Sequence, residues 1–407
     1  MGVILFIPWF KLEQWDVPLP HLVGGVLALC ALAALRPQWR EQAMSTALFA
    51  VVGGVAAHLY GLETVPVQPF GILVAIGVLV GSRLAEWQGK QWGIRPSVTA
   101  DFITHVTVIG LVTCYVLNGI FYEWDVFVEV VSKPIALAAG LLGGLFVFVQ
   151  LTKETGVRSA AIIGVAMALA AAAGVGSIVD GRWLGLSSFG GFIGAAFAVW
   201  VWKQRRKLPA LGLAECACWC FPAVWFFGRM GCFVVHDHPG AKTDFFLAVA
   251  DYNGVVGEAR HDLGFYEVLW SAFAFALFWK LRTRQERPTG FFVALLPMLY
   301  TPIRFGLDFL RATDVSNPDV RFWGLTPAQY AAVGFFVFSV LFMRWVLRRE
   351  PPEIPPEMAW PIPEDELVAA ETESDSPSTK TKASTKTKAS SKTKRKKPSR
   401  SKKASAN

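Results

Sequence analysis

Apolar stretches long enough to cross a lipid bilayer recur along most of this 407-residue chain. A helix needs about 20 mostly apolar residues to cross the hydrocarbon core, and about eleven stretches, several of them short, meet that need. Their centres lie near Leu27, Gly53, Ala75, Gly110, Gly143, Ala168, Ala195, Cys218, Phe273, Leu296 and Phe335. Hydrophobic residues make up 53% of the chain and charged residues 17%, which is too apolar for one soluble core. The sequence therefore predicts an all-α polytopic membrane protein.

Basic residues recur in every second connection between the predicted spans. These connections hold Arg36 and Arg40; Arg83, Lys90 and Arg95; Lys153 and Arg158; Lys203, Arg205, Arg206 and Lys207; Lys280, Arg282, Arg284 and Arg287; and Arg344, Arg348 and Arg349. By contrast, residues 61–69 include no basic residue, and residues 122–133 include three acids and one lysine. Because lysine and arginine accumulate on the cytoplasmic side, this alternation predicts an outer N-terminus and a cytoplasmic C-terminus.

The C-terminal segment, residues 350–407, has a different composition. It is rich in proline, then in acids, then in lysine, serine and threonine. Such a segment buries too little apolar area to offset the entropy of ordering, so we expect a disordered tail that solubilises the protein or contacts anionic lipids. Much of the net charge of +8 lies in this tail and in the short connections, and so we expect no nucleic-acid partner. Five of the six cysteines lie in apolar runs and predict packing rather than disulfides.

Four polar clusters interrupt the apolar sequence on the predicted outer side. They are residues 185–194 (GLSSFGGFIG), 227–240 (FGRMGCFVVHDHPG), 259–267 (ARHDLGFYE) and 304–314 (RFGLDFLRATD). Charged side chains near membrane spans are costly and usually mark a bundle interior, a water interface or a site. Arginine presents five fixed donors that suit a phosphate. We therefore interpret Arg229, with Arg260, Arg304 and Arg311, as an anion site for a lipid phosphate.

Each cluster also has a structural interpretation. Gly190 and Gly191 either admit a headgroup or backbone at close range or form a helix packing seam. Arg304, Asp308 and Arg311 fall at i, i+4 and i+7, on one face of a predicted helix, and would also suit an ion-pair ladder. A metal site built from Cys232, His236, Asp237 and His238 is disfavoured, because the spacing C-x3-H-x-H is not a well-defined zinc pattern. We predict no metal and no cofactor, and favour a histidine base near a phosphate.

The cluster at residues 227–240 carries a resemblance to a known family. Gly228, Arg229, Gly231, Phe233 and Gly240 follow the order of the motif G-R-x-G-N-F-x-N-x-E-x-x-G, with Asp237 at the acidic position. The chain thereby resembles the prolipoprotein diacylglyceryl transferases. Further similar positions are Pro69 to Ile72, Gly110 with Tyr115, Phe189 with Gly190, Gly191 and Gly194, Arg260 and His261 with Tyr266 and Glu267, Arg304 with Asp308, Phe309 and Arg311, and Leu325 and Thr326 with Gln329.

The resemblance implies a fold with a core and two additions. A transferase-like core of seven helices is expected at residues 67–349. One extra transmembrane hairpin would precede it at residues 1–66, and a second would be inserted at about residues 134–177.

The resemblance also implies an activity. A diacylglyceryl group would pass from phosphatidylglycerol to the lipobox cysteine of a prolipoprotein signal peptide, at the outer face of the bacterial inner membrane. Arg229 and Arg304 would hold the phosphate, with Arg260 and Arg311 in support. Asp237 and Asp308 would orient these arginines, and Glu267 would orient His261. Gly190, Gly191, Gly228, Gly231 and Tyr115 would line the site for the substrate and membrane lipid.

The chain departs from the family pattern at several positions. Phe189 stands where the family has a histidine, Cys232 and Val235 replace two asparagines, Val112 replaces an arginine, and Asp262 replaces a proline. Since phenylalanine takes no proton, a base would have to come from His236, His238 or His261. The alternative is a non-catalytic paralogue that binds phospholipid. A transporter is disfavoured, because polar residues in the middle spans are few.

Overall fold

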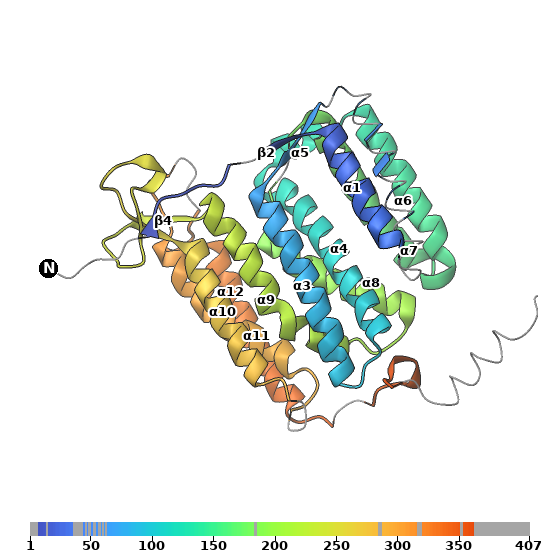
Figure 1. Cartoon of the computed structure of the whole chain (residues 1–407). Helices are drawn as coiled ribbons and strands as arrows, with labels where there is room; N and C mark the ends of the chain where they lie inside the picture. Colours follow the sequence, from blue (N-terminus) through green and yellow to red (C-terminus); the bar gives the residue numbers. More distant parts are fainter. Residues whose placement is uncertain are drawn as a thin grey trace, which may run out of the picture. The chain divides into compact units, whose positions relative to one another are not determined.

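The structure of the protein is a computed structural model. It describes residues 7–13, 15–35, 61, 63–182, 185–283, 287–315, 320–350 and 353–361, together with scattered positions between 44 and 58. Helices dominate the described part of the chain (Figure 1). The all-α polytopic fold class is therefore confirmed. The predicted span near Gly53 and the predicted disordered tail beyond residue 361 lie outside the described residues.

The helices follow the predicted apolar stretches. They are α1 (Leu19–Ala34), α3 (Pro69–Gln91), α4 (Pro96–Tyr122), α5 (Trp124–Val131), α6 (Pro134–Thr155), α7 (Val157–Asp180), α8 (Ser188–Arg206), α9 (Leu211–Val235), α10 (Leu263–Lys280), α11 (Phe291–Leu307) and α12 (Pro327–Val346). Short 3₁₀ helices occur at η2 (Tyr252–Gly254), η4 (Asp308–Leu310) and η5 (Pro356–Met358). Apart from the one near Gly53, each predicted centre falls on one of these helices.

Seven helices in the described part of the chain are long and apolar enough to cross a membrane: α3, α4, α6, α7, α9, α12, and α11 together with η4. Three other helices lie on predicted spans but are too short or not apolar enough to be counted with these seven. Helix α1 has 16 residues, α8 ends in a run of basic residues, and the 18 residues of α10 include Glu267 and Lys280. The count of about eleven spans remains a prediction.

Proline and a capping box fix where several helices begin. Prolines occupy the first turns of α3, α4, α6 and α12, where the missing N–H costs no helical hydrogen bond. In α12, the Thr326 hydroxyl accepts from the Gln329 backbone N–H, and the Gln329 side chain accepts from the Thr326 backbone N–H. This reciprocal pair satisfies two donors at the helix start and anchors the segment beside η4.

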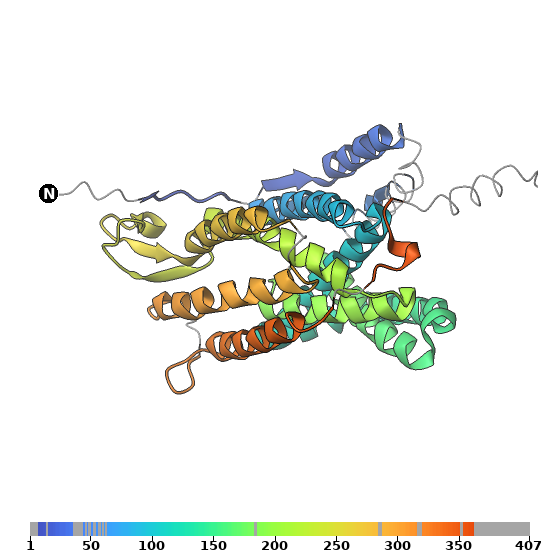
Figure 2. The same cartoon turned by 90° about the horizontal axis from the view of Figure 1, so that it is seen from below.

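Small residues bring helix pairs together. In the α6–α7 hairpin, a Cβ added to Gly140 or Gly144 would meet α7 backbone oxygens at 2.8 and 2.7 Å. Helix α3 packs on α9, α4 on α8, α10 on α9 and α11 on α12 (Figures 1 and 2). Glycine thus permits backbone contact that larger side chains would prevent. The hairpin lies at the segment predicted as an insertion, about residues 134–177. That it is an addition to a seven-helix core remains a prediction.

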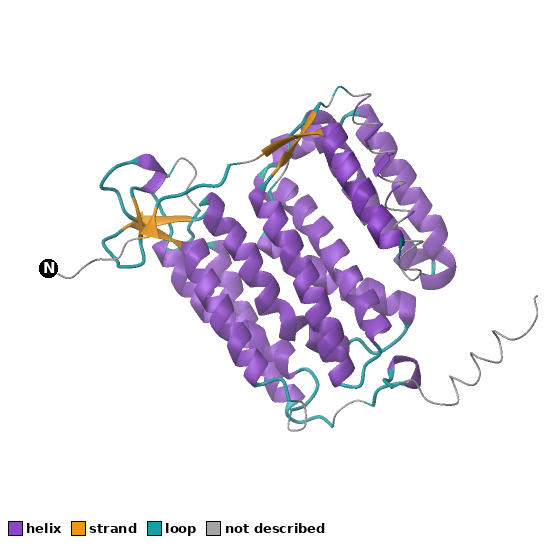
Figure 3. Ribbon diagram, in the orientation of Figure 1, coloured by secondary structure: helices purple, strands orange, loops and turns teal. Residues whose placement is uncertain are grey.

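In the described part of the chain two small sheets accompany the helices, and the sequence did not predict them. One sheet has the order β1 (Ile7–Pro8), β5 (Val249–Ala250), β6 (Arg260–Asp262) and β4 (Pro239–Lys242). The other pairs β2 (Trp15–Pro18) with β3 (Thr64–Val67) in antiparallel fashion. The four-stranded sheet lies beyond the ends of α9 and α10 (Figure 3). Such short strands carry too little periodicity to be recognised in the sequence.

Candidate active site

Successive helices of opposite direction bring three of the predicted polar clusters to one end of the bundle. The C-terminal ends of α9 and α11 and the N-terminal ends of α10 and α12 meet there, beside the four-stranded sheet (Figure 1). The backbone confirms this proximity, because Gly240 bridges to Arg311 and the Ala312 N–H donates to the Pro239 carbonyl at 3.2 Å. The segments at residues 227–240, 259–267 and 304–314 therefore surround one region.

Arg229 and Glu267 form a buried ion pair between α9 and α10. The Arg229 Nε lies 2.9 Å from the Glu267 Oε2, and the two side chains are 6% and 3% exposed. The same carboxylate oxygen accepts from the Trp225 indole at 3.0 Å and from the Tyr300 hydroxyl at 2.9 Å. The Arg229 guanidinium also lies 4.6 Å from the centre of a Trp225 ring. The carboxylate offsets the cost of burying the guanidinium and holds it in one orientation.

Asp308 binds the other two arginines at the end of α11. Its Oδ1 lies 2.5 Å from the Arg304 Nη1 and 3.2 Å from the Arg311 Nε. Its Oδ2 accepts a short hydrogen bond from the Thr326 hydroxyl. Asp308 itself is 1% exposed. The prediction that the three residues share one helix face is wrong, because α11 ends at Leu307 and Arg311 has an extended backbone (φ −64°, ψ 141°).

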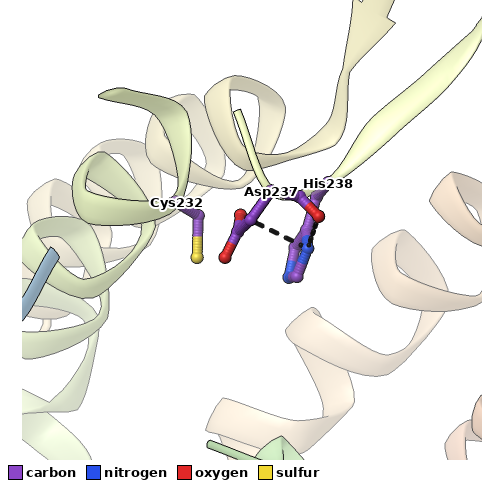
Figure 4. A group of neighbouring side chains, drawn as sticks. All are labelled: Cys232, Asp237 and His238. Atoms are coloured by element: carbon purple, nitrogen blue, oxygen red, sulfur yellow. Dashed lines mark hydrogen bonds and ion pairs between the residues drawn. The ribbon is translucent and has the colours of Figure 1, made fainter. Parts of the chain in front are cut away.

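The three arginines converge on the turn that follows α9. Arg229, Arg304 and Arg311 all act electrostatically on His238. Figure 4 shows the side chains of Cys232, Asp237 and His238 side by side, extending to the same side of the backbone, and their polar atoms lie within 4.8 Å of one another. Arg229 donates to the Cys232 sulfur at 3.8 Å. Cations from two helices and an extended segment thus face a single cysteine, aspartate and histidine.

Burial sets the protonation of the two titratable groups on this turn. It raises the pKa of Asp237 to about 6, although the nearby Arg229 acts in the opposite direction. It lowers the pKa of His238 to about 3, and the charges of the three arginines act in the same direction. Both side chains still reach solvent, with exposed fractions of 41% for Asp237 and 28% for His238. A neutral imidazole and a carboxyl that titrates near neutral pH therefore stand at the arginine cluster.

Cys232, Asp237 and His238 offer the sulfur, oxygen and nitrogen atoms that zinc prefers. Arg229 already donates to the sulfur, and Arg304 and Arg311 add positive charge beside the imidazole. A divalent cation would be repelled by these charges. We assign no metal to this group.

The other predicted histidines lie outside the arginine cluster. His236 is buried, with its Nδ1 at 2.6 Å from the Asp262 Oδ2 and its Nε2 at 2.5 Å from the Phe10 carbonyl oxygen. His261, on β6, has its Nδ1 at 2.7 Å from the Tyr266 hydroxyl. The prediction that Glu267 orients His261 is therefore wrong, because Glu267 binds Arg229 instead.

Arg260 is held by acidic and backbone partners of its own. Its guanidinium binds both carboxylate oxygens of Asp314, at 2.8 and 2.5 Å, and also Glu258 and the Gly240 carbonyl. These bonds occupy the donors that a phosphate would need and tie β6 to the segment after η4. Support of the phosphate by Arg260 stays a prediction that these contacts do not favour.

The predicted glycines and Tyr115 mostly make helix contacts. A Cβ added to Gly190 would lie 2.8 Å from the Cys114 Cα, and one on Gly231 would lie 2.8 Å from a Phe70 ring carbon. A Cβ added to Gly191 would meet only the Cys114 sulfur, at 3.5 Å. A Cβ added to Gly228 would meet no atom within 4 Å. Tyr115 donates to the Ser177 hydroxyl of α7 at 2.5 Å. The side chain of Phe189 lies outside the described residues. Close packing explains Gly190 and Gly231, while substrate binding by these residues remains a prediction.

Two residues of this region escaped sequence analysis. Trp225 and Tyr300 lie within apolar spans and look like ordinary membrane aromatics in the sequence. Their polar tips both reach Glu267. A buried indole or phenol usually has a partner, but its identity depends on which helices pack together.

Comparison with known proteins covers this same region. Residues 175–345 match the family model described as prolipoprotein diacylglyceryl transferase. Over these residues the chain is similar to that family. The matched residues include α8 to α12, and with them Arg229, Glu267, Arg304, Asp308 and Arg311.

Individual transferases of the family match the chain at moderate identity. A protein of Chromohalobacter salexigens named phosphatidylglycerol–prolipoprotein diacylglyceryl transferase is 30% identical over 168 residues, which are 41% of this chain and 62% of the relative. One of the same name from Nitratidesulfovibrio vulgaris is 31% identical over 166 residues, which are 40% of this chain and 60% of the relative. A third protein of the same name, from Bacillus cytotoxicus, is 24% identical over 304 residues, which are 73% of this chain and 92% of the relative. The chain therefore spans about three fifths of the length of the first two relatives.

Proposed function

We propose that this protein transfers a diacylglyceryl group from phosphatidylglycerol to the cysteine thiol of a prolipoprotein. The observation that carries the proposal is the position of three arginines beside the turn after α9. Arg229 donates to the Cys232 sulfur, Arg304 and Arg311 share Asp308, and the Arg311 backbone bridges to Gly240. These arginines lie in the region that matches the transferase family, and relatives over the same region are named for this activity.

The charges of this cluster suit a phosphate diester. Three guanidinium groups are paired directly with two carboxylates, those of Glu267 and Asp308. One positive charge is therefore left over among the paired groups, and a phosphate diester carries one negative charge. Asp237 is nearby, but because its pKa is raised to about 6, its carboxylate readily takes up a proton and becomes neutral when a second anion binds.

The reaction requires a leaving phosphate to be stabilised. As the cysteine sulfur bonds to the glycerol carbon, the carbon–oxygen bond to the phosphate breaks and the electron pair moves onto the phosphate oxygen. Donors that already point at this oxygen stabilise the transition state without reorganising. Arg229 is held by Glu267 and Trp225, and Arg304 and Arg311 are held by Asp308. Fixed partners thus give each arginine the preorganisation that this chemistry needs.

The proposal includes a place in the cell and a division of the chain. The site would face outward from the bacterial inner membrane, with the N-terminus outside and the tail in the cytoplasm, as the alternating basic connections indicate. There it would meet the lipobox cysteine of a signal peptide. Residues 67–349 would form the catalytic core, with hairpins at residues 1–66 and about 134–177 as additions.

Complementation tests this proposal. Cells depleted of their own transferase would express the wild-type chain, Arg229→Ala or Arg348→Ala, and lipoprotein maturation would be followed by mass spectrometry of the modified cysteine. Arg348 is an exposed arginine just after α12, remote from the cluster in sequence and element, and serves as the matched control. We expect maturation with the wild type and with Arg348→Ala, and loss with Arg229→Ala. A membrane-inserted wild type that supports no maturation would favour the phospholipid-binding alternative.

A further inference from the structure

Transfer to a thiol needs a group that removes the thiol proton, and three histidines lie at this end of the bundle. They are His236, His238 and His261. Their hydrogen bonds differ, and a base must present a ring nitrogen that carries a lone pair and can be reached by the substrate. These bonds therefore separate the candidates.

Both ring nitrogens of His236 are occupied by hydrogen-bond partners. Its two ring nitrogens face the Asp262 carboxylate at 2.6 Å and the Phe10 carbonyl at 2.5 Å, and both of these partners accept hydrogen bonds. Neither nitrogen is therefore open to a substrate. The side chain is also 1% exposed and stacks against Trp9 with ring centroids 4.3 Å apart. His236 therefore has a structural role, joining the turn after α9 to the N-terminal segment.

His238 has the opposite arrangement. Its Nδ1 lies 2.9 Å from the Asp237 carbonyl oxygen, an acceptor, and 3.4 Å from the Asp237 carboxylate. The Nδ1 must therefore carry the hydrogen, which leaves the lone pair of the neutral ring on Nε2. Among the described residues, Nε2 has no hydrogen-bond partner. With 28% of its side chain exposed, His238 can be reached by a substrate.

The surroundings of His238 keep it neutral and place it beside the phosphate. Arg229 and Cys232 face it from α9, Arg304 faces it from α11, and Arg311 faces it from the segment after η4, with Asp237 on its own turn. Burial and the three arginines together lower the pKa of His238 to about 3, so the ring accepts a proton only when the negative charge of the bound phosphate offsets these cations. Its imidazole is therefore unprotonated at neutral pH. His261 differs, because it lies on β6 and its Nδ1 faces the Tyr266 hydroxyl at 2.7 Å, away from the arginines that bind Glu267 and Asp308.

We propose that the Nε2 of His238 is the general base that accepts the proton of the substrate thiol. This inference rests on the proposed function and deepens it. The proton moves from sulfur to Nε2, the thiolate forms a bond to the glycerol carbon, and the phosphate leaves with the electron pair of the broken carbon–oxygen bond. The arginine cluster then binds the negative charge of the departing glycerol phosphate, and the imidazolium releases its proton to this product or to water. Asp237 is a positioning residue that fixes the ring through its carbonyl and carboxylate.

The position of His238 also accounts for the departure at Phe189. The family pattern supplies a histidine at the start of the α8 segment, whereas this chain has phenylalanine there. His238, three residues beyond the end of α9 at Val235, reaches the same arginines from another element. The chain thus retains the phosphate-binding residues while the proton acceptor comes from a different segment.

Purified full-length protein in detergent, with phosphatidylglycerol and a synthetic lipobox peptide, tests this inference. At pH 7, His238→Ala is expected to lower kcat/KM about 100-fold, in the range for loss of a general base. Its rate should then rise toward that of the wild type as the pH passes about 8.5, where a free cysteine thiol ionises unaided. Added imidazole should restore part of the rate. His105→Ala, a change on α4 in a different group of contacts, is the matched control.

The outcomes separate the two proposals. A wild type without transfer overturns the proposed function, whereas a His238→Ala rate within about threefold of an active wild type overturns the base assignment. A large loss that neither imidazole nor high pH reduces would also overturn it, because it would indicate a structural role. His238→Gln keeps a donor for the Asp237 carbonyl and applies the same criteria if the alanine variant unfolds.

Discussion

Replacing Glu267 by glutamine would test the ion pair at the centre of the site. Glutamine has nearly the same shape, and its carbonyl oxygen can still accept from Trp225 and Tyr300, so the main change is the loss of one negative charge opposite Arg229. Two unit charges about 4 Å apart attract by about 4 kcal/mol at an effective dielectric constant of about 20. Removal of one partner of a buried pair commonly costs about 3–5 kcal/mol. We therefore expect Glu267→Gln to lower the free energy of unfolding by about 3–5 kcal/mol.

Unfolding in mixed micelles, driven by a denaturing detergent and followed by tryptophan fluorescence, measures this change. Glu86→Gln is the matched control, because Glu86 pairs with an Arg83 whose side chain is 67% exposed. Such an exposed pair should contribute less than about 1 kcal/mol. The double variant Arg229→Met with Glu267→Gln removes both charges and keeps an acceptor for Trp225 and Tyr300, and we expect it to regain most of the stability while transfer stays lost.

Transfer should respond as well, because Glu267 orients Arg229. A loss of about 10²-fold in rate is expected for Glu267→Gln, similar to the effect of removing one preorganised donor. If the variant unfolded within about 1 kcal/mol of the wild type, water would have to reach the Arg229 guanidinium, and the interpretation of a desolvated, preorganised pair would be refuted.

Two further predictions concern the neighbouring groups. Because burial raises the pKa of Asp237 to about 6, ionisation of this carboxyl destabilises the fold as the pH rises through that value. Asp237→Asn should therefore raise the free energy of unfolding above about pH 6, by about 1 kcal/mol after solvent screening. Below about pH 4 the variant should have no effect. Thr326→Ala removes the cap of α12 and a hydrogen bond to Asp308, and should cost about 1–2 kcal/mol in the same unfolding assay, whereas Thr326→Ser should cost little.

The sequence by itself determined the class of protein and the residues that gather at the site. Apolar stretches of span length placed the helices, because only helices and closed barrels satisfy backbone hydrogen bonds inside a bilayer. Because successive spans run in opposite directions, the ends of α9 and α11 lie on the same side as the starts of α10 and α12. Arg229, Arg304 and Arg311 could be predicted together for this reason, since charged residues at consecutive span ends on one side must meet near one surface.

The tertiary structure alone decided the partners of those residues. Glu267 pairs with Arg229 rather than His261, since α10 packs on α9 with this face inward. The end of α11 at Leu307 frees Arg311 from the helix, so that it approaches Asp308 from an extended segment. Sequence patterns specify which face of a helix is polar, but a hydrogen bond depends on positions across helices that are distant in the chain.

The same reason explains why sequence alone could not choose among the histidines. His236 and His238 are two residues apart in one polar segment, and nothing local distinguishes them. A left-handed backbone at His236 (φ 51°) ends α9 there and separates the directions of the two side chains. One ring is thereby buried between the acceptors Asp262 and Phe10, and the other faces three arginines. The sequence determined that a histidine is available at this site, and the fold decided which of its nitrogens holds a free lone pair.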